Sequence, residues 1–193
     1  MARSSFDAKQ KIGKDKDYTV KEYTPESLVK DLMLLIPFEK KDLVLDVGSG
    51  NNKVWYNNIP TNNKDEVEID EGKDFFKYNH KVDWVVGNPP FRGIIDFIFK
   101  SSEICNKGFG FLMGHSRINQ LTPKRLTDLQ EKGFYLNKIH IFGVKKWFGR
   151  YYFLLWTKEK SPSISWCKTN YSDKTEGGIP PTDKSVGILP NFL

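Results

Sequence analysis

The stretch Asn88-Pro89-Pro90-Phe91 carries the side chains in this sequence whose types and spacing are best suited to chemistry. It follows Val82–Gly87, a valine-rich run that ends abruptly at glycine and two prolines, a pattern that predicts a buried strand opening into a rigid loop. The prolines remove two backbone donors and fix φ, which leaves carbonyl oxygens on a stiff turn. Asn88 adds an amide oxygen and Phe91 adds a flat ring. These groups are suited to hold a planar heterocycle that carries an amino group.

This tetrapeptide resembles the Asn-Pro-Pro-Phe/Tyr motif of the S-adenosylmethionine-dependent amino-methyltransferases, especially those that act on the exocyclic amine of adenine. The resemblance implies that the catalytic residues are Asn88, Pro89, Pro90 and Phe91. The Asn88 side-chain oxygen and the Pro89 carbonyl would each accept a hydrogen of the amine, and Phe91 would stack on the base. A proline-rich turn after a core strand is the structural alternative.

A second motif, Leu45-Asp46-Val47-Gly48-Ser49-Gly50, ends the strand predicted at Asp42–Val47. Its glycines allow the backbone to approach a ligand closely. The motif resembles the main cofactor motif of the same family, which implies that Asp46 and the glycine loop surround the amino-acid part of S-adenosylmethionine. A dinucleotide site would need a third glycine that opens a helix, and Asn51-Asn52-Lys53 stands there instead.

Residues Tyr23, Thr24 and Pro25 precede a helix that is predicted to end at Pro37. Thr24 is a natural N-cap, and Pro25 suits the first helical position. In the family that the chain resembles, a Thr-Pro pair that opens such a helix contacts the cofactor near its methionine end. An ordinary capped helix is the structural alternative.

Acidic residues end the next predicted strand, Val67–Asp70. A carboxylate at such a strand end can accept hydrogen bonds from two ribose hydroxyls. By resemblance, Glu68 is the first choice for this acid and Asp70 the second, while Asp74 would take the amine of the cofactor's adenine and Phe75 would pack on its base. The predicted cofactor-binding residues are Tyr23, Thr24, Pro25, Asp46, Gly48, Ser49, Gly50, Glu68, Asp70, Asp74 and Phe75.

Two stretches are shorter than the usual fold of this family requires. Residues 51–67 are polar and rich in turn formers where a crossover helix belongs, and only residues 77–81 separate the Asp74 segment from the strand before Asn88. A usual third strand and its helix are therefore missing. We predict an α/β, three-layer Rossmann-like class I methyltransferase fold with a mostly parallel sheet, trimmed around the second and third strands.

The remaining segments complete this fold. They are predicted as a helix at Ile94–Cys105, a strand at Phe109–Met113, a polar loop at His115–Gln120, a helix from Thr122 to Gly133, and strands at Leu136–Phe142 and Tyr151–Thr157. The last two strands form a C-terminal antiparallel hairpin. Residues 1–160 form the catalytic domain, with a polar arm at 1–20, and residues 161–193 form a partly irregular extension.

Positive charge is concentrated in one part of the chain. The 193 residues carry a net charge of +6, and His115–Arg150 alone holds eight basic residues against two acidic ones. A localised basic excess predicts a polyanionic partner, here nucleic acid. The residues predicted to bind it are Arg92, Arg117, Lys124, Arg125, Lys145, Lys146 and Arg150.

Composition disfavours several other classes of protein. No apolar run approaches membrane-spanning length, and residues 1–20 have no signal-like apolar core. The two cysteines are isolated and the three histidines are scattered, so neither a disulfide framework nor a metal site is expected. We expect an intracellular protein, cytoplasmic or nuclear, that does not bind a membrane.

These motifs predict an adenine-N6 methyltransferase that uses S-adenosylmethionine and acts on DNA, with the target base flipped out of the duplex. RNA is the second choice of substrate. Two other hypotheses are a glutamine-specific protein methyltransferase, whose motif usually ends in tyrosine, and a catalytically inactive nucleic-acid-binding subunit. Because no separate target-recognition domain is visible, we expect a short recognition sequence or a specificity partner, with a homodimer as another arrangement.

Overall fold

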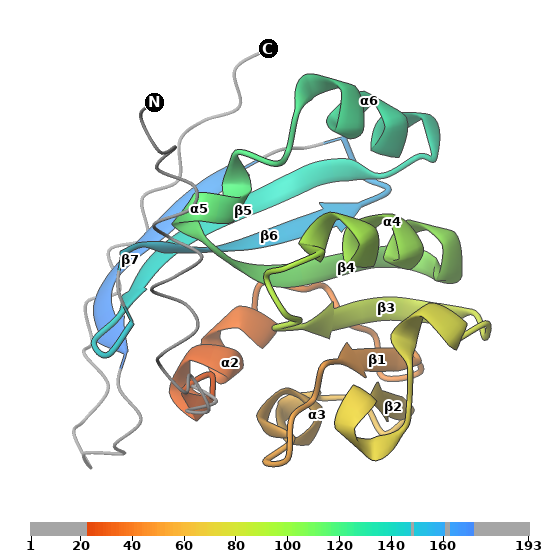
Figure 1. Ribbon diagram of the computed structural model, residues 1–193, viewed down its shortest axis with the longest axis horizontal. Helices are drawn as coiled ribbons and strands as arrows, with labels where there is room; N and C mark the ends of the chain where they lie inside the picture. Colours follow the sequence, from red (N-terminus) through yellow and green to blue (C-terminus); the bar gives the residue numbers. More distant parts are fainter. Residues whose placement is uncertain (1–22, 148, 161–162, 172–193) are drawn as a thin grey trace, which may run out of the picture.

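In the part of the chain that the structure describes, seven strands form one mixed sheet that carries helices on both faces (Figure 1). The computed structural model describes residues 23–147, 149–160 and 163–171. The helices are α2 (Glu26–Met33), α3 (Val54–Asn58), α4 (Ile94–Ile104), α5 (His115–Ile118) and α6 (Pro123–Glu131), with single 3-10 turns η1 (Ile69–Glu71) and η2 (Phe75–Lys77). The strands are β1 (Val44–Val47), β2 (Lys64–Val67), β3 (Val82–Gly87), β4 (Cys105–Gly114), β5 (Tyr135–Val144), β6 (Tyr151–Thr157) and β7 (Ser163–Tyr171).

The order of the strands places two loops side by side. The sheet runs β2-β1-β3-β4-β6-β5-β7, and among these strands β6 is antiparallel to its neighbours while the other pairs are parallel. From β1 the chain moves outward to β2 and then returns to β3 on the other side of β1. Ligands of such sheets bind at this switch point, outside the carboxyl ends of the strands. The loops after β1 and β3 meet there.

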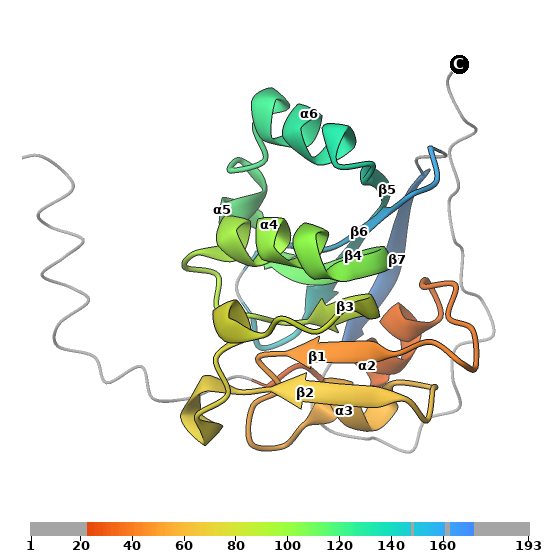
Figure 2. The same cartoon turned by 90° about the vertical axis from the view of Figure 1, so that its right-hand side faces the viewer.

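Two separate apolar cores confirm the three layers. Helices α4 and α6 cover one face of the sheet, and α2 and α3 cover the other (Figure 2). The first pair buries Ile98 and Leu129, and the second pair buries Leu32 and Trp55. Trp84, Val85 and Val86 of β3 alternate between the two cores, as the pleat of a strand requires. Because β3 is covered on both faces, its sequence is almost wholly apolar.

The trimmed form of the fold is also confirmed. Helix α3 has five residues, and the chain between β2 and β3 contains only η1 and η2. Within the described residues no strand lies outside β2, which is therefore an edge strand. The strand predicted at Val67–Asp70 was placed three residues too late, because β2 spans Lys64–Val67 and shares only Val67 with it. β2 ends at Val67 because the Glu68 carboxylate accepts the N–H of Asp70 and starts the turn η1.

Two further predictions were wrong at the level of elements. The segment predicted as a polar loop begins with α5, a four-residue helix directly after β4. Residues 163–171 were assigned to a partly irregular extension, but they form β7, which pairs in parallel with β5. The strand was not predicted because it pairs with an edge of β5, a contact that the local sequence does not reveal. The predicted hairpin of β5 and β6 is confirmed.

Candidate active site

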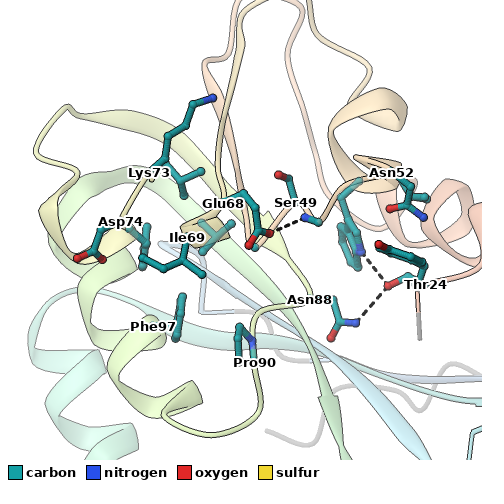
Figure 3. Close-up of a pocket in the computed structure, with 18 of the residues that line it drawn as sticks. Thr24, Ser49, Asn52, Glu68, Ile69, Lys73, Asp74, Asn88, Pro90 and Phe97 are labelled. Carbon is teal, nitrogen blue, oxygen red and sulfur yellow. Dashed lines mark hydrogen bonds between the residues drawn. The ribbon is translucent and has the colours of Figure 1, made fainter. Parts of the chain in front are cut away.

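A cavity of about 560 Å³ opens at the carboxyl ends of β1, β2 and β3, where the strand order reverses. Its volume lies in the range of small-molecule binding sites. The segment before α2, the loop after β1, the segment after β2 and the loop after β3 all contribute side chains to it (Figure 3). Stretches that lie far apart in the sequence therefore meet at one site.

The sequence predicted ten of the residues that line this cavity. They are Tyr23, Thr24, Gly48, Ser49, Gly50, Glu68, Asp74, Phe75, Asn88 and Pro90. Five other predicted residues lie outside the lining: Pro25, Asp46, Asp70, Pro89 and Phe91. The lining also includes residues that were not predicted as site residues, namely Val47, Asn52, Val54, Trp55, Val67, Ile69, Lys73, Phe76 and Phe97. Most of these are apolar residues close in sequence to a motif residue. That proximity is the one sequence feature from which they could have been predicted to line the cavity.

The loop after β1 is held against both neighbouring loops. Gly48 and Gly50 have φ angles of 71° and 62°, a region that favours glycine. The Gly48 N–H donates to the carbonyl of Val67 at 2.9 Å. A Cβ at Gly48 would lie 3.3 Å from the Cα of Pro89. This packing brings the β1 loop directly beside the β3 loop, so that one ligand can contact both.

Glu68 places a carboxylate at the end of β2. The residue is 7% exposed, and its Oε2 accepts the N–H of Gly50 at 2.7 Å (Figure 3). Its Oε1 accepts the N–H of Asp70 at 3.3 Å. Each carboxylate oxygen has a further lone pair, so the group can also accept hydrogens from ligand hydroxyls. Of the two acids predicted for this role, Glu68 is the one that lines the cavity.

A second acid, Glu66, is buried beside the cavity and is paired with two lysines. Its carboxylate accepts hydrogen bonds from the hydroxyl of Ser49 at 2.6 Å, from Lys53 at 3.0 Å and from Lys73. Burial by itself raises the pKa of Glu66, but the donors, Lys73 first, outweigh it and lower the pKa to about 2. This ion cluster ties the glycine loop to the segment after β2, where a longer crossover helix is missing.

One end of the cavity is apolar. Phe75 and Phe97 stack with ring centroids 5.3 Å apart and planes within 3° of parallel, and Phe76 packs edge-on against Phe97 at 4.9 Å. Ile69 and Phe76 are 63% and 47% exposed, so the rim of this end is apolar as well. Asp74 lies at the same end (Figure 3), where its carboxylate accepts the N–H of Phe76 at 2.9 Å. A slot of this kind suits a flat aromatic ring that carries a polar edge.

The opposite end of the cavity is polar and centres on Thr24. Its Oγ1 accepts the indole N–H of Trp55 at 3.1 Å and the amide N–H of Asn88 at 3.2 Å (Figure 3). The prediction that Thr24 caps α2 was wrong: Pro25 occupies the N-cap, and no side chain caps the helix. Thr24 is instead an acceptor for two side chains that come from other elements.

The amide oxygen of Asn88 has a different environment from its amide nitrogen. Oδ1 is buried and has no hydrogen-bond partner within the described residues. A buried acceptor without a donor costs about 1–3 kcal/mol of stability. A side chain retained in this state at the wall of a cavity is suited to a ligand that brings a hydrogen-bond donor.

Asp46 lies outside the cavity lining, close beneath it. Its Oδ2 accepts the N–H of Tyr56 in α3 at 2.9 Å, and its Oδ1 has no partner in the described part of the chain. Burial, together with the nearby carboxylates of Glu66 and Glu68, raises the pKa of Asp46 to about 8. Asp46 thus accepts a hydrogen bond from the protein's own backbone and holds α3 against β1.

Pro89 and Phe91 also lie outside the cavity lining. Phe91 packs over Gly114 at the end of β4, where a Cβ would come within 3.1 Å of its ring. Its ring centroid lies 6.3 Å from that of Tyr151, which in turn lies 4.7 Å from that of Trp147. These three rings form an aromatic group next to the Asn88 loop.

Several of the basic residues gather at the same edge of the sheet for a topological reason. Arg92 follows β3, Arg117 lies in α5 after β4, and Lys145, Lys146 and Arg150 lie between β5 and β6. β3, β4 and β5 run in the same direction, so their carboxyl ends share the edge that carries Asn88. The four side chains other than Arg117 are exposed.

Other basic residues of the same segment make contacts within the protein. Lys124 pairs with Asp128 at 3.0 Å on the surface of α6. Arg125 and Lys138 each donate to a backbone carbonyl, at 2.6 Å and 2.9 Å. The positive charge of residues 115–150 is therefore only partly concentrated at the edge that carries the cavity.

Comparisons with known proteins identify the fold. No protein-family model and no curated protein matches the sequence. A proposed RNA methyltransferase from Pyrococcus horikoshii is 19% identical with a TM-score of 0.55, over 83% of this chain and 98% of its own. A proposed class I S-adenosylmethionine-dependent methyltransferase from Listeria monocytogenes is 15% identical with a TM-score of 0.57. The match covers 84% of this chain and 68% of that protein. The fold is that of the class I methyltransferases.

A third solved structure is the M protein of the type I restriction enzyme EcoKI, which is 12% identical with a TM-score of 0.55. The match covers 78% of this chain and 51% of that protein, so this chain spans about half of its length. At these identities the likeness concerns the fold. The cavity at the switch point between β1 and β3 is where a ligand of such a sheet binds.

Two structural findings concern other kinds of site. Among residues 23–147, 149–160 and 163–171, no group of three or more histidine, cysteine, aspartate or glutamate side chains is placed to hold a metal ion. In the same part of the chain, no helix has the length and apolar character needed to cross a membrane.

Proposed function

We propose that the chain is a methyltransferase that uses S-adenosylmethionine and acts on the exocyclic amine of adenine in DNA. The observation that carries this proposal is the buried amide oxygen of Asn88, which lies at the cavity without a donor in the described part of the chain. An exocyclic amine brings the donor that this oxygen lacks. The methyltransferase fold and the Asn88–Phe91 turn support the same assignment.

The cavity fits S-adenosylmethionine in size and in chemistry. Glu68 would accept the ribose hydroxyls, and the glycine loop between β1 and α3 would lie along the amino-acid part. The stacked pair Phe75 and Phe97 would pack against the adenine of the cofactor, with Asp74 beside its amine. When bound, S-adenosylmethionine supplies a methyl group that is activated by its positively charged sulfur.

The turn after β3 would then act on the target amine. This amine is a weak nucleophile because its lone pair is delocalised into the ring. Asn88 Oδ1 and the Pro89 carbonyl each accept one of its hydrogens, which draws the nitrogen toward tetrahedral geometry and localises the lone pair. Positioning and matched dipoles supply most of the effect, so no strong general base is required. Phe91, beside the cavity, offers a ring on which the base stacks.

The basic edge supports a nucleic acid as the substrate. Arg92, Lys145, Lys146 and Arg150 are exposed at the edge that carries Asn88, where they would hold phosphates while the target base is flipped toward the turn. The neighbours in fold include RNA methyltransferases as well as M proteins of restriction enzymes, so RNA is the second candidate. A specificity partner or a homodimer would supply longer sequence recognition.

The two remaining hypotheses are each disfavoured by features of the sequence and the structure. A glutamine-specific protein methyltransferase is disfavoured by Phe91, where tyrosine is usual, and by the basic edge. A catalytically inactive subunit is disfavoured because the cavity retains both the Glu68 carboxylate and the unpartnered oxygen of Asn88.

The proposal is tested with S-adenosylmethionine that carries a radiolabelled methyl group and three acceptors: duplex DNA, RNA, and a protein extract treated with nucleases. We expect label in DNA with the wild-type protein and none with Asn88→Ala. Label in RNA alone would move the substrate to RNA, and label in protein alone would favour the glutamine enzyme. Binding of S-adenosylmethionine by calorimetry without transfer to any acceptor would favour an inactive subunit.

A further inference from the structure

The side-chain amide of Asn88 has two chemically opposite ends. Its oxygen only accepts hydrogen bonds, and its nitrogen donates two. If the oxygen faces the target, it accepts a hydrogen of the amine. If the nitrogen faces the target, two N–H groups oppose each other and the base is repelled. The orientation of this one amide therefore decides whether the turn after β3 can act in the proposed way.

Hydrogen bonds at Thr24 distinguish the two ends of the Asn88 amide. Asn88 Nδ2 donates to Thr24 Oγ1 at 3.2 Å, and this contact leaves Oδ1 as the end without a partner in the described residues. The same Thr24 oxygen accepts the indole N–H of Trp55 at 3.1 Å. An indole N–H can only donate, so Trp55 uses one lone pair of the hydroxyl oxygen, and the second lone pair accepts the amide N–H of Asn88.

This arrangement is rigid because its parts are buried and come from three different elements. Thr24 and Trp55 are 5% and 3% exposed. Thr24 precedes α2, Trp55 belongs to α3, and Asn88 follows β3, so the three residues meet only in the folded chain. The indole is held in turn by Phe153 of β6, whose ring stacks on it with centroids 6.1 Å apart.

We propose that Thr24, held by Trp55, is a positioning residue that turns the amide oxygen of Asn88 toward the target amine. This inference rests on the proposed function and names how its central side chain is oriented. It also gives a reason for Thr24 at this place, since α2 begins without a side-chain cap. Thr24 acts through Asn88 and does not itself touch the reacting atoms.

The test uses Thr24→Val, which keeps the shape of the side chain and removes the hydroxyl, with Thr24→Ser as the matched control that restores it. In single-turnover methyl transfer to duplex DNA, we expect Thr24→Val to lower the rate about 10- to 100-fold, less than the removal of a directly contacting group. Thr24→Ser should stay near the wild-type rate. Affinity for S-adenosylhomocysteine, measured by calorimetry, should change much less than the rate in both variants.

A second readout is independent of activity. In the folded wild-type protein, the side-chain N–H signals of Asn88, assigned in NMR spectra by their loss in Asn88→Asp, should be protected from solvent exchange. Thr24→Val should remove this protection and Thr24→Ser should keep it. Trp55→Phe, which removes the indole N–H and keeps an aromatic ring, serves as the second variant if Thr24→Val does not fold, and it should give intermediate protection.

The outcomes separate the inference from the proposed function. A Thr24→Val protein with a wild-type rate and a protected Asn88 amide would overturn the inference, while methylation of adenine by the wild type would leave the proposed function intact. A wild-type protein that methylates no nucleic acid would contradict the proposed function, and the exchange of the Asn88 amide would then decide alone whether Thr24 orients it. Unchanged protection of the Asn88 amide in Trp55→Phe would show that Trp55 is not needed to orient it.

Discussion

Asn88 and Glu68 line different parts of the cavity, and the roles proposed for them can be tested one side chain at a time. Asn88 comes from the turn after β3 and offers a buried acceptor. Glu68 comes from the end of β2 and offers a carboxylate tied to the glycine loop. A change at one residue is therefore expected to affect transfer, and a change at the other is expected to affect the binding of the cofactor.

Asn88→Ala is expected to reduce methyl transfer at least about 100-fold, because the acceptor that aligns the amine is lost. Affinity for S-adenosylhomocysteine should remain near wild type, since the contact is with the target and not with the cofactor. Single-turnover kinetics and calorimetry on the same preparation measure the two effects. Turnover close to wild type in this variant would remove Asn88 from its role.

Glu68→Ala is expected to weaken binding of S-adenosylmethionine by about 1–3 kcal/mol, the cost of hydrogen bonds to a charged acceptor. Asp70→Ala is the matched control, because Asp70 is an acid two residues away that lies outside the cavity lining. Calorimetric titration should show the loss in the first variant alone. Equal losses in both would mean that the ribose is held differently.

Among the elements, β1, β3 and the loops after them could be predicted from the sequence. A buried parallel strand has an apolar sequence, and in this chain both strands end at glycine or proline. β3 and β6 have the predicted bounds. The apolar end of the cavity was harder to predict: Phe97 and Ile69 reach it only through the packing of α4 and η1. The contact between Thr24 and Asn88 spans 64 residues, and no local pattern encodes it.

The strand β7 shows the limit of composition as a guide. Its sequence has the polar residues of a tail, and its pairing with β5 depends on an edge that exists only after the sheet has formed. The contacts of Asp46 likewise could not be predicted from the sequence. An aspartate in this motif can either contact a ligand or hold the protein's own backbone. In the structure Asp46 accepts a backbone N–H of α3.

This link between β1 and α3 predicts a pH dependence of stability. The pKa of Asp46 is raised from 3.8 to about 8 in the folded protein, so the folded state binds a proton that the unfolded state has released. The stabilisation is complete below about pH 4 and is lost as the pH rises toward 8, with a slope of at most about 1.4 kcal/mol per pH unit. Asp46→Asn, which does not titrate, should flatten this slope in denaturant unfolding measured from pH 5 to 8. A slope unchanged by the substitution would show that Asp46 is ionised throughout.

At the scale of the whole molecule, the fold keeps the methyltransferase switch point while it dispenses with a full crossover helix. The glycine loop is held instead by the ion cluster of Glu66 with Lys53 and Lys73. The other half of the described sheet contains β4, β6, β5 and β7, and exposed basic residues follow β3 and β5 at the same edge of the sheet as the cavity. The proposed sites for the cofactor and for nucleic acid thus lie at adjacent parts of one edge of the sheet.

Reversal of Lys145 and Lys146 to glutamate is expected to weaken binding to unrelated DNA sequences about equally, because phosphate contacts do not specify sequence. The dependence of log affinity on log salt should become shallower by about 0.9 per lost contact on duplex DNA, or about 0.7 on single strands. Reversal of Lys40 and Lys41, which are also adjacent and exposed but precede β1 at the opposite edge, is the matched control. An equal change in both double variants would assign the effect to net charge alone.

The identity of the methylated nucleoside tests the central claim most directly. Duplex DNA is incubated with the protein and S-adenosylmethionine that carries a trideuterated methyl group, and its nucleosides are then analysed by mass spectrometry. The account predicts deuterated N6-methyldeoxyadenosine with the wild-type protein and none with Asn88→Ala. Deuterium on cytosine alone, or on no nucleoside of DNA or RNA while the protein binds the cofactor, would contradict it.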